Sequence, residues 1–217
     1  MSWLITPQIK SLDGVPVGTP YGGGYIAGFI SHTADGNPTH ALIVAPRATG
    51  ATGTGYTLTA NLQWKTTTTT TIGTTSNFDG AANTAAMVTA GIANHPAAQF
   101  CVNLSIGGFT DWYLPSRYEL DIAYFNLKPS TTENNTSWGT NVYSVPRRNS
   151  NWTAAYPQQT ALTAFNTSAE AFVAAIHRSS TEFSATNGWH LYFDSGRQSG
   201  GSKTSLLCVR AFRRIAL

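Results

Sequence analysis

Residues 111–120 read DWYLPSRYEL, and this stretch predicts a short strand that turns directly into a helix. Its first four residues are rich in aromatic side chains, which favour strands, and Pro115 ends the strand because it cannot donate to a sheet. Ser116 and Glu119 have the spacing of a capping box, in which each side chain accepts a hydrogen bond from the backbone amide of the other residue. We therefore expect a helix that begins after Ser116 and runs to about Leu127.

Two further helices are predicted upstream of this stretch. Residues 81–93 contain good helix formers with recurrent apolar positions, and either Asn77 or Asp79 can cap their N-terminus. Pro96 suits the first turn of a second short helix over residues 95–102. The helical part of the chain is therefore expected to lie in its middle third.

The other predicted elements are antiparallel strands. The first pair surrounds a strong turn signal, Asp-Gly-Asn-Pro, at residues 35–38. A Gly/Ser-rich turn is expected before the last strand, with Gly200 and Gly201 accepting a positive φ. This pattern predicts an α+β fold with small antiparallel sheets, two to three helices and long irregular loops. The strands are predicted over residues 25–31, 41–45, 178–183, 188–193 and 206–213.

We divide the chain into two regions. Residues 1–76 are predicted to form an N-terminal arm and a small β-rich attachment region, because prolines recur through residues 1–20 and the first predicted strands follow. Residues 77–217 are predicted to form the larger α+β domain.

Composition excludes several classes of partner. Charged residues make up 11% of the 217 residues, against about 25% in an average soluble domain, and the net charge is only +3. Arg210, Arg213 and Arg214 form the only basic cluster, so a nucleic-acid partner is not expected. The sequence contains no run of about 18 apolar residues, so membrane insertion is not expected. Residues 1–10 lack the pattern of a secretory signal, and we expect synthesis in the cytoplasm.

Neither a metal nor a cofactor is expected. Cys101 and Cys208 allow at most one disulfide, and their spacing favours two buried thiols instead. No two of the five histidines have the helical spacing of a metal site, and acidic residues are too sparse for an evident calcium cage.

Catalysis is the less favoured interpretation, and no catalytic residue is expected. Asp111, Glu119 and Asp121 are close in sequence, and paired carboxylates can perform acid–base chemistry. The capping box and the helix start already account for two of them. A glycan-directed enzyme therefore remains only an alternative.

The C-terminal segment favours binding. Residues 183–202 are rich in Tyr, Trp, Ser, Gly, Asn and Arg, the residue types that antibody paratopes use as rigid anchors and adaptable polar groups. A plain β-hairpin with a Gly-rich turn would have a similar composition, and composition alone does not separate these two interpretations.

The sequence resembles the Lcl C-terminal domain family at several motifs. Residues 111–120 resemble its DW-R/Y-LP-T/S-xx-EL motif, and residues 178–182 resemble its WSSTE element. Residues 189–193 and 209–214 resemble its closing strands, WxxxF and VRAVRR. Order and spacing match over about residues 77–217, which is about two thirds of the chain.

The resemblance implies a C-type-lectin-like fold related to the formylglycine-generating-enzyme group. Members with a similar Gly-rich N-terminal part resemble phage and prophage tail proteins, and some resemble the variable proteins of diversity-generating retroelements. In those, a reverse transcriptase rewrites adenine-containing codons near the 3′ end of the gene, and the altered residues form the ligand-binding face. Arg178 stands where the family usually has Trp, and Cys208 where it usually has Arg.

By this resemblance we expect a non-enzymatic receptor-binding protein with a variable C-terminal face. Trp112 and Trp189 are expected to be largely buried. The predicted ligand-facing residues are His190, Tyr192, Asp194, Ser195, Arg197, Ser199, Gly200, Gly201, Ser202 and Thr204. The predicted scaffold residues are Trp112, Glu119, Trp189, Phe193 and Arg210.

The expected partners are a host-cell surface receptor, either protein or glycan, and other virion tail proteins. A homotrimer is expected, and the expected location is the virion tail. A bacterial surface adhesin with the same domain is the alternative. A second alternative places the binding site in the long polar loop of residues 128–159, which contains Trp138, Tyr143 and Trp152.

Overall fold

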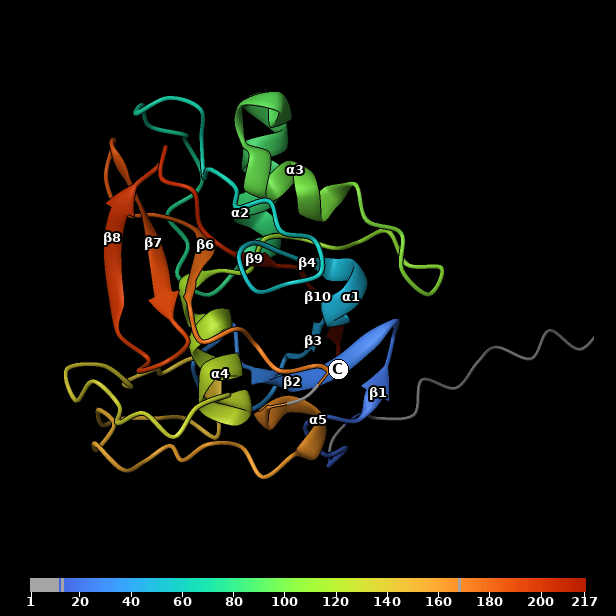
Figure 1. The fold of residues 1–217 in the computed structure, drawn as a ribbon, viewed down its shortest axis with the longest axis vertical. Helices are drawn as coiled ribbons and strands as arrows, with labels where there is room; N and C mark the ends of the chain where they lie inside the picture. The colour runs from blue at the N-terminus through green and yellow to red at the C-terminus, as the bar shows by residue number, and fades with distance from the viewer. Residues whose placement is uncertain (1–11, 13, 168) are drawn as a thin grey trace, which may run out of the picture.

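The structure is a computed structural model that describes residues 12, 14–167 and 169–217. Several small antiparallel sheets and a few helices make up an α+β fold, which confirms the predicted fold class. A three-stranded sheet lies along one side of the molecule, with two helices at one end and long loops at the other (Figure 1). Most of the expected arm of residues 1–20 lies outside the described residues.

The largest sheet joins the beginning of the chain to its end. Its strand order is β1-β2-β3-β10, and β5 pairs with β2. Because β3 pairs with β10 along its whole length, the expected attachment region and the expected C-terminal domain share one sheet. The predicted strands over residues 25–31 and 41–45 are confirmed. The strands are β1 (Pro20–Tyr21), β2 (Gly24–Ile30), β3 (His40–Val44), β5 (Ser144–Val145) and β10 (Phe212–Ala216).

The three predicted helices begin where the sequence indicates, although the first ends at Thr89 and not at residue 93. The Asp79 carboxylate accepts a hydrogen bond from the backbone N–H of Ala82, which caps the first long helix. The capping box of residues 116–119 is complete: the Ser116 hydroxyl accepts from the Glu119 amide, and the Glu119 carboxylate accepts from the Ser116 amide. The helices are α1 (Arg47–Gly50), α2 (Gly80–Thr89), η1 (Ile92–Asn94), α3 (Pro96–Val102), α4 (Arg117–Leu127) and α5 (Thr163–Asn166).

The C-terminal strands differ from the prediction in two respects. β6 (Ile176–Glu182), β7 (Asn187–Tyr192) and β8 (Gln198–Ser202) form the three-stranded antiparallel sheet. The predicted tight turn at Gly200 and Gly201 is wrong, because both residues lie within β8. They leave room for neighbouring rings, since a Cβ would meet Phe183 at Gly200 and His190 at Gly201.

The reversal between β7 and β8 falls earlier in the chain. Gly196 has a φ of 70° there, and a Cβ at this position would overlap the Trp152 ring. After β8, the predicted strand over residues 206–213 divides into β9 (Val209–Arg210), which pairs with β4 (Ala51–Thr52), and β10.

The DWYLP stretch lies in the core. Trp112 is 2% exposed, which confirms its predicted burial, and Leu114 is fully buried. The predicted strand reduces to a single bridge, in which Tyr113 pairs with Phe212 of β10. Cys101 and Cys208 are buried free thiols, as predicted.

Candidate functional site

The structure divides the predicted ligand-facing residues between the two faces of the β6–β7–β8 sheet. Directly opposite residues of antiparallel strands share a face. Trp189 lies opposite Gly200, whereas the next residue, His190, lies opposite Ser199 and Arg178. We call these the Trp189 face and the His190 face. The predicted residues therefore do not form one continuous surface on this sheet.

The Trp189 face carries a cluster of aromatic rings around a guanidinium group. The Arg117 guanidinium, from the first turn of α4, lies 3.8 Å from the centroid of the Trp189 ring and 5.2 Å from that of Trp138. Phe183 meets Trp189 edge to face, with ring centroids 4.7 Å apart, and Phe183 is 49% exposed. The ring centroids of Trp138 and Trp189 are 6.0 Å apart. The predicted sheet site and the alternative long-loop site thus meet at one surface.

A buried carboxylate holds this surface together. The Arg117 Nε donates to the Gln198 side-chain oxygen at 2.5 Å, and the Gln198 amide donates to Asp121 Oδ2 at 3.4 Å. Asp121 Oδ1 also accepts from the Asn141 amide at 2.7 Å and from the Arg148 guanidinium. Burial raises the pKa of Asp121, while Arg148 opposes that shift. Asp121 thereby connects α4, β8 and the long loop.

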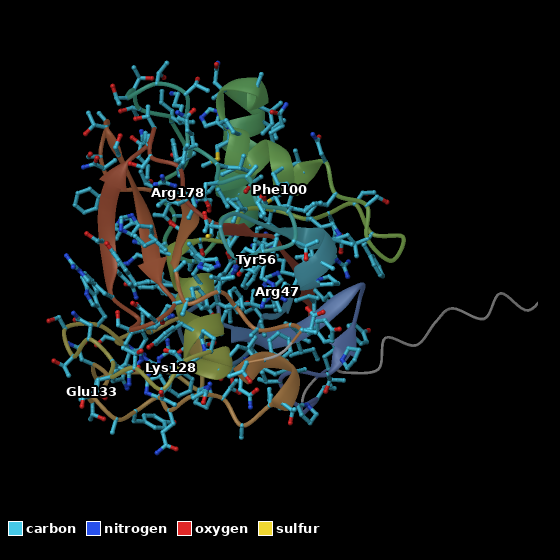
Figure 2. The ribbon with its side chains drawn as sticks, viewed as in Figure 1. Arg47, Tyr56, Phe100, Lys128, Glu133 and Arg178 are labelled. Atoms are coloured by element: carbon cyan, nitrogen blue, oxygen red, sulfur yellow. The ribbon has the colours of Figure 1, made fainter. Side chains whose placement is uncertain are left out.

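The His190 face has a buried cation that is not paired with a carboxylate of any described residue. Arg178, labelled in Figure 2, donates from Nη2 to the backbone oxygens of Ser202 at 3.2 Å and Ser205 at 2.7 Å. Among the described residues, Arg178 Nε and Nη1 and both ring nitrogens of His190 have no hydrogen-bond partner. Burial lowers the pKa of Arg178 to about 9. Burial, with the charges of Arg178 and Arg197, lowers the pKa of His190 to about 4.

Only the outer part of the His190 face is open to solvent. Tyr192 is half-buried, and the exposed Arg197 guanidinium lies 5.5 Å from the centroid of its ring. His190, in contrast, is buried. A ligand on this face would therefore contact Tyr192 and Arg197 before it reached His190.

The remaining predicted residues lie near the ends of β8. The backbone oxygen of Asp194 accepts from the Ser130 hydroxyl at 2.8 Å, and that of Ser195 accepts from the Asn135 amide at 2.8 Å. These bonds tie the β7–β8 turn to the long loop. The hydroxyls of Ser202 and Thr204 are 2.9 Å apart at the other end of β8.

The predicted scaffold is buried except at one position. Phe193 stacks on Phe172 with ring centroids 4.1 Å apart, and Arg210 forms an ion pair with Glu170 at 3.0 Å. Trp189 is half-buried, so the expectation that it is largely buried holds only in part.

The carboxylates considered for catalysis are all engaged in structural contacts. Asp111 accepts two hydrogen bonds from Arg213 at 2.8 and 2.9 Å. Glu119 completes the capping box and accepts from the Tyr113 hydroxyl at 2.7 Å. Burial raises the pKa of Glu119 to about 7. Asp121 holds Arg148, Asn141 and Gln198, as described above.

Metal-ligand clusters and membrane-spanning helices are both absent from the described part of the chain. Within it, no group of three or more His, Cys, Asp or Glu side chains could hold a metal ion. No described helix is sufficiently long and apolar to cross a membrane.

Sequence reasoning did not assign Arg117 or Phe183 to the site, and it gave Trp138 only to the alternative. Arg117 was not considered for binding because it lies within the capping segment, which already had a local structural role. Phe183 directly follows the predicted WSSTE-like element, and its exposure could be learned only from the structure.

No protein-family model matches this chain, and no curated protein matches it.

Proposed function

We propose that this chain is a non-enzymatic receptor-binding protein of a phage or prophage tail, with a C-type-lectin-like fold. Its binding surface is centred on the Trp189 face, and Tyr192 and Arg197, on the opposite His190 face of the sheet, form a second contact region. The receptor is a protein or glycan of the host-cell surface, and the remaining partners are other virion tail proteins and two further copies of the chain.

Contacts between the motifs support the family assignment. Asp111 of the first motif forms an ion pair with Arg213 of the last motif at 2.8 Å. The Ser180 amide, in the WSSTE-like element, donates to the Pro115 oxygen at 2.7 Å. The segments that carry the resemblance therefore contact one another in this fold.

The observation that carries the binding proposal is the partly exposed cluster of Phe183, Trp189, Arg117 and Trp138. Trp, Tyr and Arg are the residue types that dominate binding hot spots. Here Arg117 is fixed by Gln198 and the rings pack on one another, so little side-chain entropy remains to be lost on association. The engaged carboxylates at Asp111, Glu119 and Asp121 favour binding over acid–base chemistry.

The proposed variable face fits this geometry in part. Tyr192 and Arg197 reach solvent, and changing them would leave the buried framework intact. A bacterial surface adhesin with the same domain remains the alternative, and it would use the same surface.

The test is adsorption of the fluorescently labelled chain to a panel of bacterial strains. On a strain that binds the wild type, Phe183→Ala/Trp138→Ala should weaken binding by at least about 30-fold, which corresponds to 2 kcal/mol. Tyr192→Ala/Arg197→Ala should also weaken it while the melting temperature stays within a few degrees. Val88→Ala is the matched control, because Val88 is a similarly exposed apolar residue on α2.

Unchanged adsorption of both double variants would refute the proposed surface. Comparison of the gene among several isolates tests the diversification separately. Sequence changes concentrated after Arg178, with a reverse transcriptase gene nearby, would support it, and changes spread evenly along the chain would contradict it.

A further inference from the structure

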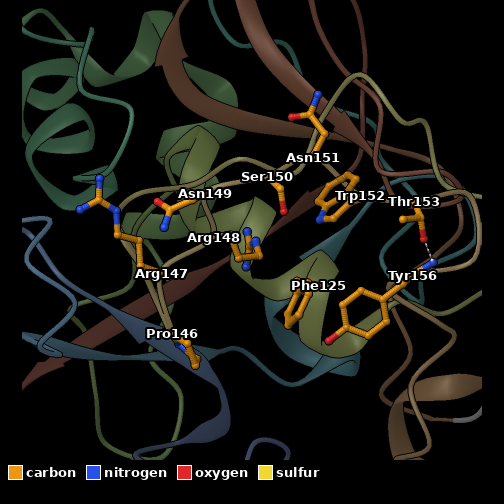
Figure 3. Close-up of a pocket in the computed structure, with 10 residues that line it drawn as sticks. All are labelled: Phe125, Pro146, Arg147, Arg148, Asn149, Ser150, Asn151, Trp152, Thr153 and Tyr156. Carbon is orange, nitrogen blue, oxygen red and sulfur yellow. Dashed lines mark hydrogen bonds between the residues drawn. The ribbon is translucent and has the colours of Figure 1, made fainter.

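A concave surface lies on the long loop, apart from the Trp189 face. It is a groove of about 470 Å³, within the range of small-molecule sites. The two surfaces adjoin through the backbone, because the Trp152 amide donates to the Trp138 oxygen at 2.8 Å. Figure 3 shows the lining residues, which are Phe125, Pro146, Arg147, Arg148, Asn149, Ser150, Asn151, Trp152, Thr153 and Tyr156.

Three aromatic rings line this groove. Phe125 of α4 and Tyr156 meet edge to face, with ring centroids 5.5 Å apart, and Trp152 lies across from them (Figure 3). Tyr156 is 58% exposed, which leaves a large ring surface in contact with water. Burying that ring against the apolar face of a ligand would be favourable.

The groove wall also contains an unused hydrogen-bond donor. Trp152 is nearly completely buried, yet its Nε1 has no hydrogen-bond partner among the described residues. Buried indole N–H groups usually find an acceptor, because an unpaired one costs free energy. A ligand oxygen at the inner wall would satisfy this donor after a small displacement of the ring.

Arg148, one of the two cations that line the groove, has a counter-charge without a ligand. Arg148 lies over Phe125 at 4.6 Å and is paired with the buried Asp121, while its Nε donates to the Gly139 oxygen at 3.0 Å. The Arg147 side chain points away from the groove in Figure 3 and donates to the Ala34 oxygen. None of the described residues that line the groove is Asp or Glu. An ionic ligand therefore gains little here.

The rim supplies uncharged polar groups. Asn149 and Ser150 form no side-chain hydrogen bond with any other described residue, and Asn151 accepts from the Thr140 hydroxyl. Amides and hydroxyls can both donate and accept, which matches the neighbouring hydroxyl groups of a sugar.

We propose that this groove binds a neutral saccharide. The C–H face of a pyranose ring would pack on Tyr156 and Phe125, one of its oxygens would accept from Trp152 Nε1, and its hydroxyls would bond to the amides of the rim. An extended peptide fits less well, because the rim offers as many acceptors as donors, whereas a peptide in a proline-rich conformation presents mainly carbonyl acceptors. This inference does not depend on the Trp189 face.

The experiment is protein-observed NMR with methyl glycosides of glucose, galactose, mannose and N-acetylglucosamine as probes, at millimolar concentrations. At least one glycoside should shift resonances of residues 146–156. Tyr156→Ala should remove that binding, and Trp152→Phe, which keeps a ring but loses the donor, should weaken it by about threefold to tenfold. Tyr21→Ala is the matched control, because Tyr21 is an exposed tyrosine of β1, and it should bind like the wild type.

Several results would overturn the proposal: no response to any neutral glycoside, binding only of sialyllactose or of a proline-rich peptide, or glycoside binding that persists in Tyr156→Ala. Melting temperatures identify any variant that is misfolded. If Tyr156→Ala is misfolded, Tyr156→Phe replaces it as the test. Tyr156→Phe keeps the ring, so it is expected to retain binding. Cell adsorption by Phe183→Ala/Trp138→Ala is independent of these readouts, so failure of one proposal leaves the other standing.

Discussion

Replacing Asp121 by Asn should loosen the long loop and lower the stability of the whole chain. The substitution keeps the shape of the side chain but removes its charge. In the wild type, Asp121 Oδ1 accepts from Asn141 at 2.7 Å and from Arg148, and Oδ2 accepts from Gln198 at 3.4 Å. The uncharged amide of the variant would leave the Arg148 guanidinium without a counter-charge and would turn an N–H group toward one of these donors.

The expected magnitude follows from the burial of this pair. Removing one partner of a buried ion pair costs about 3–5 kcal/mol, because the other charge is left uncompensated. The Arg148 side chain is 12% exposed and keeps its bond to the Gly139 oxygen, so it can recover some hydration. We therefore expect a loss near the lower limit, about 3 kcal/mol in the free energy of unfolding.

The assay is urea denaturation together with hydrogen exchange of residues 139–153. Glu133→Gln is the control, because Glu133 is an exposed carboxylate in the same loop (Figure 2), and it should change stability by less than about 0.5 kcal/mol. Arg148→Met should also destabilise, since it leaves Asp121 buried and unpaired. The double variant should lose less than the sum of the two single losses, because it buries no isolated charge.

Two results would refute this reasoning. One is a loss below about 1 kcal/mol for Asp121→Asn with unchanged exchange in the loop, which is typical of a surface site. The other is strict additivity in the double variant, which would show that the two side chains act independently.

Three further predictions concern the framework, and each is measured by urea denaturation. Trp112→Ala should cost about 3–5 kcal/mol, as for a large-to-small change in a core, and a loss below about 1 kcal/mol would contradict its burial. Burial raises the pKa of Glu119 from 4.5 to about 7, so the folded state holds this proton more tightly than the unfolded state does. The contribution of Glu119 to stability therefore falls as the pH rises from about 4.5 to about 7. Relative to Glu119→Gln, the wild type should lose about 3 kcal/mol across that window, and a constant difference between the two would exclude this titration. Arg178→Met should be neutral or stabilising, because it removes a buried charge that has no carboxylate partner among the described residues. Arg210→Met leaves the Glu170 carboxylate without its cation and should cost about 3 kcal/mol. Equal losses in the two variants would show that the protein compensates the charge of Arg178.

Local contacts explain which parts of the fold the sequence predicts. The capping box joins residues three positions apart, and Asp79 caps α2 through the amide three residues later. Such contacts depend only on the nearby chain, so the residue pattern is sufficient to predict them. The DWYLP segment forms only a single bridge, and its partner, Phe212, lies at the far end of the chain, where the residues of the segment alone do not indicate it.

The strand β8 shows where local reasoning fails. Its sequence, QSGGS, has weak strand propensity and indicates a turn. The structure makes it a strand because the two glycines leave space for Phe183 and His190 and because β7 offers a free edge. Strand propensity mostly reflects such packing, which the residues of β8 alone do not reveal.

The division of the predicted site has a related cause. Side chains alternate between faces along a strand, so Trp189 and His190 of β7 had to point in opposite directions. The register of β8 was needed to assign Ser199 and Gly200 to these faces, and only the pairing with β7 supplies it. Arg117 and Trp138 joined the site through tertiary contacts that no spacing in the sequence indicates.

The polar network around Asp121 lets both proposed surfaces change while the fold stays fixed. Arg117 and Gln198 connect Asp121 to the Trp189 face, and Arg148 connects it to the groove. The exposed residues Phe183 and Tyr156 take no part in this network, so a substitution there alters the chemistry of one surface without leaving a buried charge unpaired. Substitution of Asp121 would disturb both surfaces at once. The arrangement of this network therefore explains both why substitutions at Phe183 and Tyr156 are tolerated and why substitution of Asp121 is not.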